Sequence, residues 1–479
     1  YPQTFTPINY VIARLIEAVN LLFFNFSDIV FCYYGTWATY RSGDGKFDVD
    51  NVNPYLCSHI AYAFAGINNQ GTVISLDPYL DLAEDGGRDN FRKFTALKNQ
   101  NPKLKTLLAV GGWNEGSAKY SVMAANSTLR SNFIQSALKM VLDHGFDGLD
   151  LDWEYPARRD TVYGSADVEN FSQLLRELRP VFDEHKLILS SAVSAVEQAS
   201  ALSYDVPTIS KYLDIINVMT YDMYGPWDPV TGHNAPLHGG IGDENTPYES
   251  LFTIDNAIKY WLKAGAPSRK LALGVPFYGH SFALTNATQN TVRSPSSGPG
   301  LAGPYTVSNG SIGYNEFCLK LQSEPWTVKY DASAKVPYAY NGLNWVSYDD
   351  IKSIRTKTKF AKKLNLGGIM IWSIETEDFK GNCNSVDFPL LRAINDELKR
   401  KVPKSKKVST NTTASATTSA VSSSTNNSSL SENSSSSETT SPAELMQIKF
   451  NCPYTLLWDQ EDLFCNYAEQ VICFFFRFI

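Results

Sequence analysis

The chain has 479 residues, of which 43% are hydrophobic and 13% aromatic, so it can bury a large core. Its formal net charge is −7, and its basic run at 399–407 flanks a Ser/Thr-rich stretch, so nucleic acid is not an expected partner. Seven cysteines include no Cys-x-x-Cys pair, which argues against a zinc ribbon or a redox motif.

The first 27 residues remain without an assigned structure. They contain an apolar patch at 21–26, but Arg14 and Glu17 precede it and no basic leader does. The segment therefore does not qualify as a signal peptide, and it is too short and too charged for a transmembrane helix.

From residue 28 onwards, short apolar runs alternate with segments of helical period, which is typical of parallel strands joined by crossover helices. We predict eight strands at about 28–33, 58–65, 104–110, 146–152, 187–194, 213–220, 271–277 and 367–373. Eight such units predict an α/β fold, a (β/α)8 TIM barrel, whose chemistry gathers at the carboxyl ends of the strands.

The fourth strand carries a row of acids. Residues two apart share a face of a strand, so Asp150, Asp152 and Glu154 point one way while the apolar residues between them point the other. Crowding of these carboxyl groups is expected to raise the pKa of one of them, as general-acid catalysis requires. The alternative is a calcium-type site or a solvated acidic edge, but the glycine of an EF-hand loop is missing.

This stretch also fills the pattern Asp-x-x-Asp-x-Asp-x-Glu, with Asp147, Asp150, Asp152 and Glu154 in the four places. With its flanking Phe-Asp-Gly and Trp-Glu-Tyr-Pro, it closely resembles the signature of glycoside hydrolase family 18, the chitinases. The resemblance covers residues 28–400 and implies hydrolysis of β-1,4 bonds in chitin and its oligomers, without a metal or other cofactor.

The resemblance also implies roles for these residues. Glu154 would be the acid and later the base, and Asp152 would hold the substrate's acetamido N–H while the acetamido oxygen attacks the anomeric carbon. Asp150 would share a proton with Asp152, and Tyr221 would donate to the acetyl oxygen. Asp147 is out of parity with the other three acids and is expected to be structural.

A second set of residues at the strand ends is expected to bind substrate. Trp372 would form the floor under the distorted sugar, and Asp222 would contact a neighbouring one. Met219 is as well explained by core packing as by lining the pocket, and His280 stands where relatives often carry Arg. Candidate stacking surfaces are Tyr33, Trp37, Trp113, Trp227 and Tyr278.

About ninety residues separate the seventh and eighth strands, too many for one crossover helix. We therefore predict an inserted small α+β subdomain at about 279–346, with a hairpin turn at Asn341-Gly342. In similar chitinases such an insertion walls a deep cleft. The family resemblance suggests disulfides between Cys32 and Cys57 and between Cys318 and Cys383; the alternative is four free buried thiols.

After a last helix near 386–400, the composition changes. Residues 403–442 are mostly Ser, Thr, Asn and Ala, which predicts a disordered, O-glycosylated linker. Residues 448–479 resemble the second half of a peritrophin-type chitin-binding module, with three of its six cysteines, so chitin binding by this tail stays open. The Ser/Thr tract and the Asn-x-Ser/Thr sequons at Asn25, Asn126, Asn170, Asn286 and Asn309 favour a secreted, extracellular glycoprotein.

Two other functions compete with hydrolysis. One is a chitinase-like lectin of the same fold that binds chitin oligomers without cleaving them; such proteins typically replace the acid corresponding to Glu154, which is present here. The other is a structural or allergen-like protein that acts through its linker and tail. For the enzyme we expect a monomer with no membrane partner, acting endo, although the expected cleft also fits cleavage from chain ends.

Overall fold

The computed structural model describes residues 29–405 and two short strands at 456–459 and 464–467. Within this part, eight parallel strands pair in the order β1-β15-β8-β7-β6-β5-β4-β2, and pairing of β1 with β2 closes the barrel. Each lies within two residues of its predicted bounds, so the predicted TIM barrel is confirmed. The strands are β1 (Ile29–Gly35), β2 (His59–Ile67), β4 (Lys105–Gly111), β5 (Gly148–Asp152), β6 (Ile188–Ser194), β7 (Ile215–Met219), β8 (Leu271–Pro276) and β15 (Gly368–Trp372).

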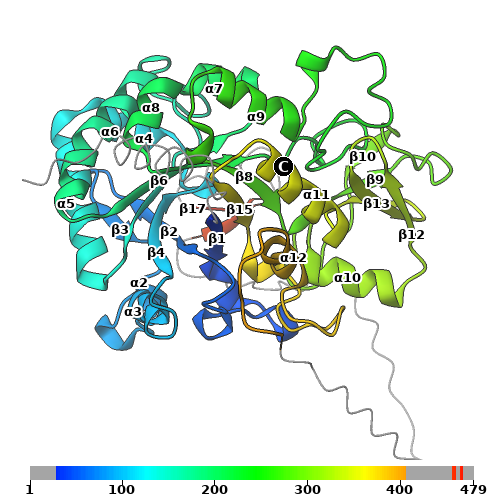
Figure 1. The fold of residues 1–479 in the computed structure, drawn as a ribbon, viewed down its shortest axis with the longest axis horizontal. Helices are drawn as coiled ribbons and strands as arrows, with labels where there is room; N and C mark the ends of the chain where they lie inside the picture. Colours follow the sequence, from blue (N-terminus) through cyan, green and yellow to red (C-terminus); the bar gives the residue numbers. More distant parts are fainter. Residues whose placement is uncertain (1–28, 406–455, 460–463, 468–479) are drawn as a thin grey trace, which may run out of the picture. The chain divides into compact units, whose positions relative to one another are not determined.

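Helices cover the outside of the barrel (Figure 1). Their ends follow local chemistry: in α5, the Asn126 side chain accepts hydrogen bonds from the backbone N–H groups of Thr128 and Leu129, and Gly145, with φ +73°, ends the helix. The α-helices of this layer are α2 (Pro78–Asp81), α3 (Asn90–Thr95), α4 (Ala118–Ala125), α5 (Ser127–His144), α6 (Ala166–Glu184), α7 (Glu197–Ser203), α8 (Val206–Tyr212), α9 (Ile254–Lys263), α11 (Ile351–Lys363) and α12 (Pro389–Glu397).

Short elements fill several connections. Strand β3 (Val73–Ser75) adds to β2 in the antiparallel sense. The 3-10 helices are η1 (Thr36–Tyr40), η2 (Gly43–Gly45), η3 (Val49–Asn51), η4 (Glu84–Gly86), η5 (Ala96–Asn99), η6 (Trp113–Glu115), η7 (Tyr248–Ser250), η8 (Ser268–Lys270) and η9 (Ile374–Thr376).

The chain segment between β8 and β15 forms a second, antiparallel sheet with one helix, on the right of Figure 1. Its strand order is β10-β9-β14-β13-β12, with β11 on β9, and it has small apolar cores of its own, one of them around Phe282 and Trp345. The predicted α+β insertion is thus present, including the hairpin at Gly342. Its elements are β9 (Tyr278–Leu284), β10 (Ser296–Pro299), β11 (Ser311–Gly313), α10 (Tyr314–Ser323), β12 (Thr327–Asp331), β13 (Val336–Asn341) and β14 (Asn344–Ser347).

Two disulfides lie within the described residues, one in the barrel and one at the insertion. Cys32 of β1 is bonded to Cys57, just before β2, and Cys318 of α10 is bonded to Cys383, after β15. These are the pairs that the family resemblance suggests. The second bond ties the insertion to the segment that follows the last barrel strand.

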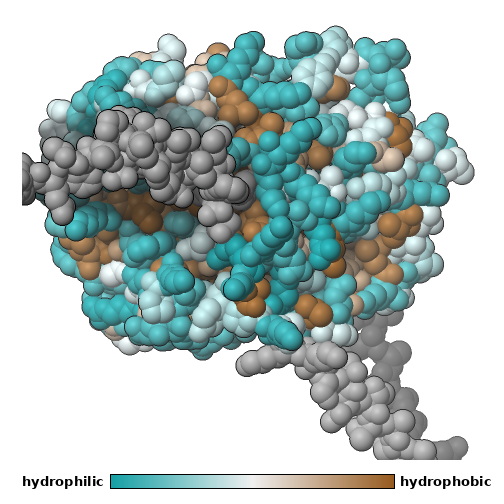
Figure 2. Space-filling model, in the orientation of Figure 1, coloured by the Kyte–Doolittle hydropathy of each residue, from teal (hydrophilic) through white to brown (hydrophobic). Residues whose placement is uncertain are grey.

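The visible face of the molecule is mostly hydrophilic, with apolar side chains in separate small patches (Figure 2). None of the helices in the described part combines the length and apolar character that crossing a membrane requires. Strands β16 (Leu456–Asp459) and β17 (Phe464–Tyr467) form a separate antiparallel hairpin. The predicted 1–27 segment, the linker and most of the chitin-binding-like tail lie outside the described residues.

Candidate active site

The acidic row lies at the carboxyl end of β5, which pairs with β4 on one side and with β6 on the other. Asp150 pairs in register with Ala109 of β4 and Ser190 of β6, and Asp152 pairs with Gly111. Asp150 and Asp152 are buried, whereas Glu154, two residues beyond the strand end, is partly exposed. The three carboxyl groups therefore run from the barrel interior towards its open end.

Asp150 is held by hydroxyl and amide donors from three other strands. The Tyr33 hydroxyl donates to Oδ2 at 2.7 Å, while Ser190 Oγ and Asn217 Nδ2 donate to Oδ1 at 2.5 and 3.4 Å. Burial raises the pKa of Asp150 to about 6, and these hydrogen bonds oppose the rise. Asp150 is thus the fixed inner end of the row.

This arrangement corrects the expectation for Tyr33. We expected a stacking surface, but the side chain is only 1% exposed, so its ring offers no open face to a sugar. Its hydroxyl instead donates to Asp150 and accepts from Asn217 Nδ2 at 3.2 Å.

Asp152 differs from Asp150 in having an unsatisfied atom. Its Oδ1 is buried and has no hydrogen-bond partner among the described residues. Burial raises the pKa of Asp152 well above its usual range, and the charges of Glu154 and Asp150 add to this. A buried acceptor without a donor is costly, so this oxygen is suited to receive a donor from a ligand.

Glu154 has the properties of a general acid. Burial raises its pKa to about 7, and the charge of Asp222 adds to the rise, while a hydrogen bond with Tyr155 and the charge of Arg159 oppose it. A carboxyl group that is half protonated near neutral pH and partly exposed can deliver a proton to a bound molecule.

The loop after β4 fixes the backbone around Glu154. Trp153 Nε1 donates to Ser117 Oγ at 2.6 Å, and Ser117 Oγ donates to the carbonyl of Tyr155 at 3.0 Å. The N–H of Gly112 donates to the carbonyl of Asp152 at 2.8 Å. Sequence analysis did not identify Ser117, because a lone Ser in a loop carries no distinctive pattern.

Stacked aromatic rings flank the row on the β1 side. Trp372, at the end of β15, lies 5.8 Å from Phe64 and 6.1 Å from Trp37, measured between ring centroids. Phe64 and Trp37 are themselves stacked at 6.3 Å. Sequence analysis predicted Trp372 and Trp37 but missed Phe64, because a Phe within an apolar strand has the pattern of a core residue.

Of the other predicted residues, Trp113 is exposed and begins η6 after β4, and the rest lie at the end of β7, after it, or at the start of the insertion. Asp222 Oδ1 accepts from the Tyr278 hydroxyl at 2.5 Å and lies 2.8 Å from His280 Nε2, and Trp227, 63% exposed, packs edge-on against His280. The buried Tyr221 has its hydroxyl 3.7 Å from the Met370 sulfur, a weak acceptor, and Met219 is partly buried at the end of β7.

Asp147 lies before β5 and apart from the row. Its carboxylate accepts from Lys98 at 2.9 Å, from Lys105 at 3.3 Å and from the backbone N–H of Thr106 at 2.9 Å. These contacts support the structural role expected for it and link it to the amino end of β4.

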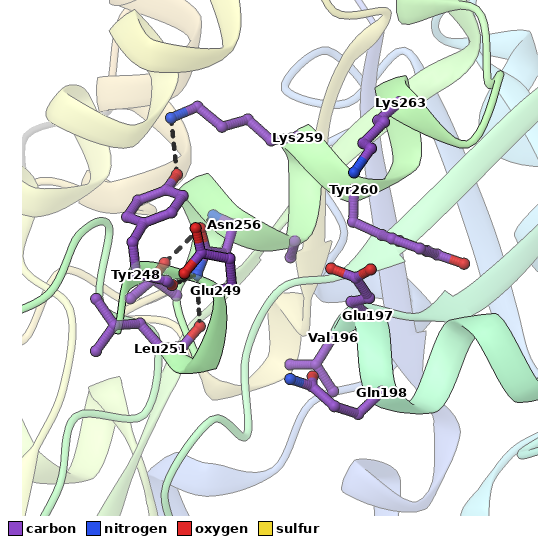
Figure 3. A pocket seen from close by; sticks show the side chains of 12 residues that line it. Val196, Glu197, Gln198, Tyr248, Glu249, Leu251, Asn256, Lys259, Tyr260 and Lys263 are labelled. Carbon is purple, nitrogen blue, oxygen red and sulfur yellow. Dashed lines mark hydrogen bonds between the residues drawn. The ribbon is translucent and has the colours of Figure 1, made fainter. Parts of the chain in front are cut away.

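Two further features of the described residues lie outside the acidic row. Cys318, Asp378 and Cys383 lie close enough to bind a metal, but the two cysteines form a disulfide and offer no thiolate. A surface hollow of about 150 Å³ lies between α7 and α9 (Figure 3). Its lining, which includes Glu197, Tyr248 and Tyr260, contains no residue of the acidic row.

Comparison with known proteins gives concordant matches. Residues 29–377 match the family described as "Glycosyl hydrolases family 18". "Probable chitinase 2" of Drosophila melanogaster is 42% identical over 398 residues, covering 77% of this chain and 80% of that protein.

Solved structures match with similar coverage. The crystal structure of Ostrinia furnacalis Group IV chitinase is 57% identical, with a TM-score of 0.76, and covers 78% of this chain and 100% of its own. Human YKL-39, described as a pseudo-chitinase with retained chitooligosaccharide binding, is 39% identical, with a TM-score of 0.71, and covers 78% and 100%.

Proposed function

Because this chain belongs to glycosyl hydrolase family 18, we propose that it is a chitinase that hydrolyses β-1,4 bonds in chitin and N-acetylglucosamine oligomers by substrate-assisted retaining catalysis. The observation that carries this proposal is the pair formed by a partly exposed Glu154, with its pKa raised to about 7, and a buried Asp152 with an unpartnered oxygen.

In the first step, protonated Glu154 donates its proton to the oxygen of the scissile bond while that bond breaks. The substrate's acetamido oxygen forms the new bond to the anomeric carbon, giving an oxazolinium ion. Asp152 accepts a hydrogen bond from the acetamido N–H and balances the positive charge that develops on the oxazolinium ring. Glu154, now a carboxylate, then removes a proton from the water that opens the ring.

Three neighbours support this pair. Asp150, with both oxygens occupied by donors, keeps the row anchored and shares a proton with Asp152, so that Asp152 is negatively charged when the acetamido group becomes positive. The Tyr221 hydroxyl, whose partner among the described residues is the Met370 sulfur, is available to donate to the acetyl oxygen. Trp372, with Phe64 beside it, offers a floor for the distorted sugar.

The alternative is a lectin that binds chitin oligomers without cleaving them, as the description of YKL-39 indicates for that relative. Hydrolysis is favoured here because Glu154 is present and lies at the outer end of the row. The test is the release of reducing ends from a soluble chitin oligomer. We expect turnover by the wild type and a loss of at least about a hundredfold in Glu154→Gln, since the amide has no acidic proton to give; equal rates would eliminate the mechanism.

The setting proposed for this enzyme is extracellular. Two disulfides are typical of chains that fold in an oxidising compartment, and they support secretion. We further propose that it acts as a monomer on internal bonds, with 403–442 as a linker and 448–479 as an accessory chitin-binding segment. Analysis of the products from a defined hexamer tests the internal mode, because cleavage from one end gives a single product size first.

A further inference from the structure

Trp113 is held differently from the other aromatic residues of the candidate site. Trp37 stacks with Phe64, Trp227 packs against His280, and Tyr278 packs against Tyr221. Within residues 29–405, no aromatic ring packs against Trp113, and its side chain is 47% exposed. Its ring partner is a cation: the guanidinium carbon of Arg159 lies 3.6 Å from the ring centroid.

Arg159 contacts Trp113 at a second point. Its Nη1 donates to the backbone carbonyl of Trp113 at 2.7 Å. A planar guanidinium that stacks on the ring and bonds the carbonyl of the same residue fixes both the indole and its backbone. The guanidinium thereby covers one face of the indole, while the side chain as a whole keeps nearly half of its surface exposed.

The loop that carries Arg159 is itself anchored. The backbone N–H of Ala157 donates to the buried Asp167 carboxylate at 3.3 Å, and the Thr161 hydroxyl donates to the same carboxylate. Asp167 belongs to the first turn of α6. Its carboxylate therefore holds the loop between Glu154 and α6 on both sides of Arg159, at Ala157 and at Thr161. Arg159 therefore presents its side chain from a fixed backbone, five residues after Glu154.

We propose that Arg159 is a positioning residue that pre-organises the Trp113 indole as a stacking surface for a sugar bound beside Glu154. An exposed indole that moves freely loses rotamer freedom when a sugar stacks on it, and holding the ring in place beforehand removes that cost. This inference rests on the proposed function for the identity of the sugar. It assigns Arg159 to the affinity for the oligomer, a role distinct from the effect of its charge on Glu154.

The test is binding of an N-acetylglucosamine hexamer to Glu154→Gln protein, measured by calorimetry, so that turnover does not enter. Adding Arg159→Gln is expected to weaken binding about two- to fivefold, the range that an exposed cation–π contact supplies. The matched control is Arg158→Gln, which removes the same charge one residue away, where the guanidinium lies 5.4 Å from the Tyr155 ring; it should leave affinity unchanged. Equal losses in the two variants would overturn the proposal.

A double-mutant cycle separates positioning from a general charge effect. In a Trp113→Ala background, Arg159→Gln should weaken binding no further; an undiminished loss there would overturn the proposal. Arg159→Lys keeps the charge but not the planar fork, so it should recover less than half of the lost affinity. Full recovery by Lys would show that charge alone is responsible and would contradict positioning by stacking.

A measurement without ligand decides the case even if the hexamer proves not to be a ligand. Acrylamide quenching of tryptophan fluorescence, compared between wild type and Trp113→Phe, isolates the contribution of Trp113. Arg159→Gln should make this contribution more accessible to the quencher, and Arg158→Gln should not. Unchanged quenching in Arg159→Gln would overturn the proposal on its own, and failure of hydrolysis alone would affect only the proposed function.

Discussion

Single residues of the acidic row are distinguished by their surroundings more than by their chemical type. Within residues 29–405, Asp150 has donors on both oxygens, Asp152 has an oxygen without one, and Glu154 reaches solvent. Three carboxyl groups of similar intrinsic acidity thereby acquire three different tasks. The role that we propose for each carboxyl group follows from how deep it lies in the barrel: Asp150 anchors the row, Asp152 holds the acetamido group and Glu154 transfers the proton.

The Tyr33 hydroxyl, a donor to Asp150, allows the role of Asp150 to be tested. In Tyr33→Phe, Asp150 loses one donor while the buried ring stays in place, so we expect kcat to fall about tenfold with little change in KM. Steady-state kinetics on a soluble chitin oligomer measure both. Unchanged kcat and KM would show that the hydroxyl donor to Asp150 is not needed and would contradict this role of Tyr33.

The pH profile of the rate tests Glu154. Since the protonated form is the active one and its pKa is about 7, kcat should fall as the pH rises through about 7. The negative charge of Asp222 raises this pKa, so Asp222→Asn should move the alkaline limb to lower pH. A limb that stays in place, or moves to higher pH, would contradict this electrostatic assignment.

Sequence reasoning reached the residues of the row but not all of their neighbours. Period-two alternation placed Asp150, Asp152 and Glu154 on one face, and the structure brings them together in that order. Alternation gives the face of a strand and not the depth, which is why Tyr33 was expected at the surface. The missed residues, Phe64 and Ser117, make their contacts with segments distant in the chain, which a local pattern does not reveal.

Among the elements, the turn after β4 shows how closely the strands meet at the site. Gly111 has φ +123°, and a Cβ there would lie 2.1 Å from the carbonyl oxygen of Asp152. Only a residue without a side chain lets β4 and β5 approach this far at the acidic row.

Gly111→Ala should therefore displace Asp152 and lower the rate more than tenfold, with a stability cost on the order of 2–4 kcal/mol. The matched control is Gly298→Ala: Gly298 has φ +125° but nothing within 4 Å of the added Cβ, so only backbone strain applies. Turnover and thermal unfolding of both variants check this. Similar losses of activity in the two would show that the close approach to Asp152 is not the cause.

Elements were more predictable than their contacts. Most barrel strands are short, largely apolar runs bounded by turn residues, and the Asn341-Gly342 turn joins β13 and β14 as expected. The pairing of β12, β13 and β14 with β9 into one sheet did not follow from the sequence, because strand order in an antiparallel insertion depends on long-range packing.

The whole molecule consists of a barrel with its insertion, followed by a chain that changes abruptly in composition. The barrel unit carries every residue of the proposed mechanism, so we expect catalysis to be independent of any retention on solid chitin. Deleting residues 403–479 should leave turnover of a soluble oligomer unchanged and reduce retention on insoluble chitin. Unchanged retention, measured by co-sedimentation, would indicate that the tail is not a tether.

The central claim is that the substrate's own acetamido group performs the displacement between Asp152 and Glu154. The most direct measurement compares the initial rates of reducing-end release from a hexamer of N-acetylglucosamine and from a fully deacetylated hexamer of the same linkage. We expect rapid cleavage of the acetylated chain and no detectable cleavage of the deacetylated one. Comparable rates on the two would contradict it, because the deacetylated sugar has no acetyl oxygen to attack the anomeric carbon.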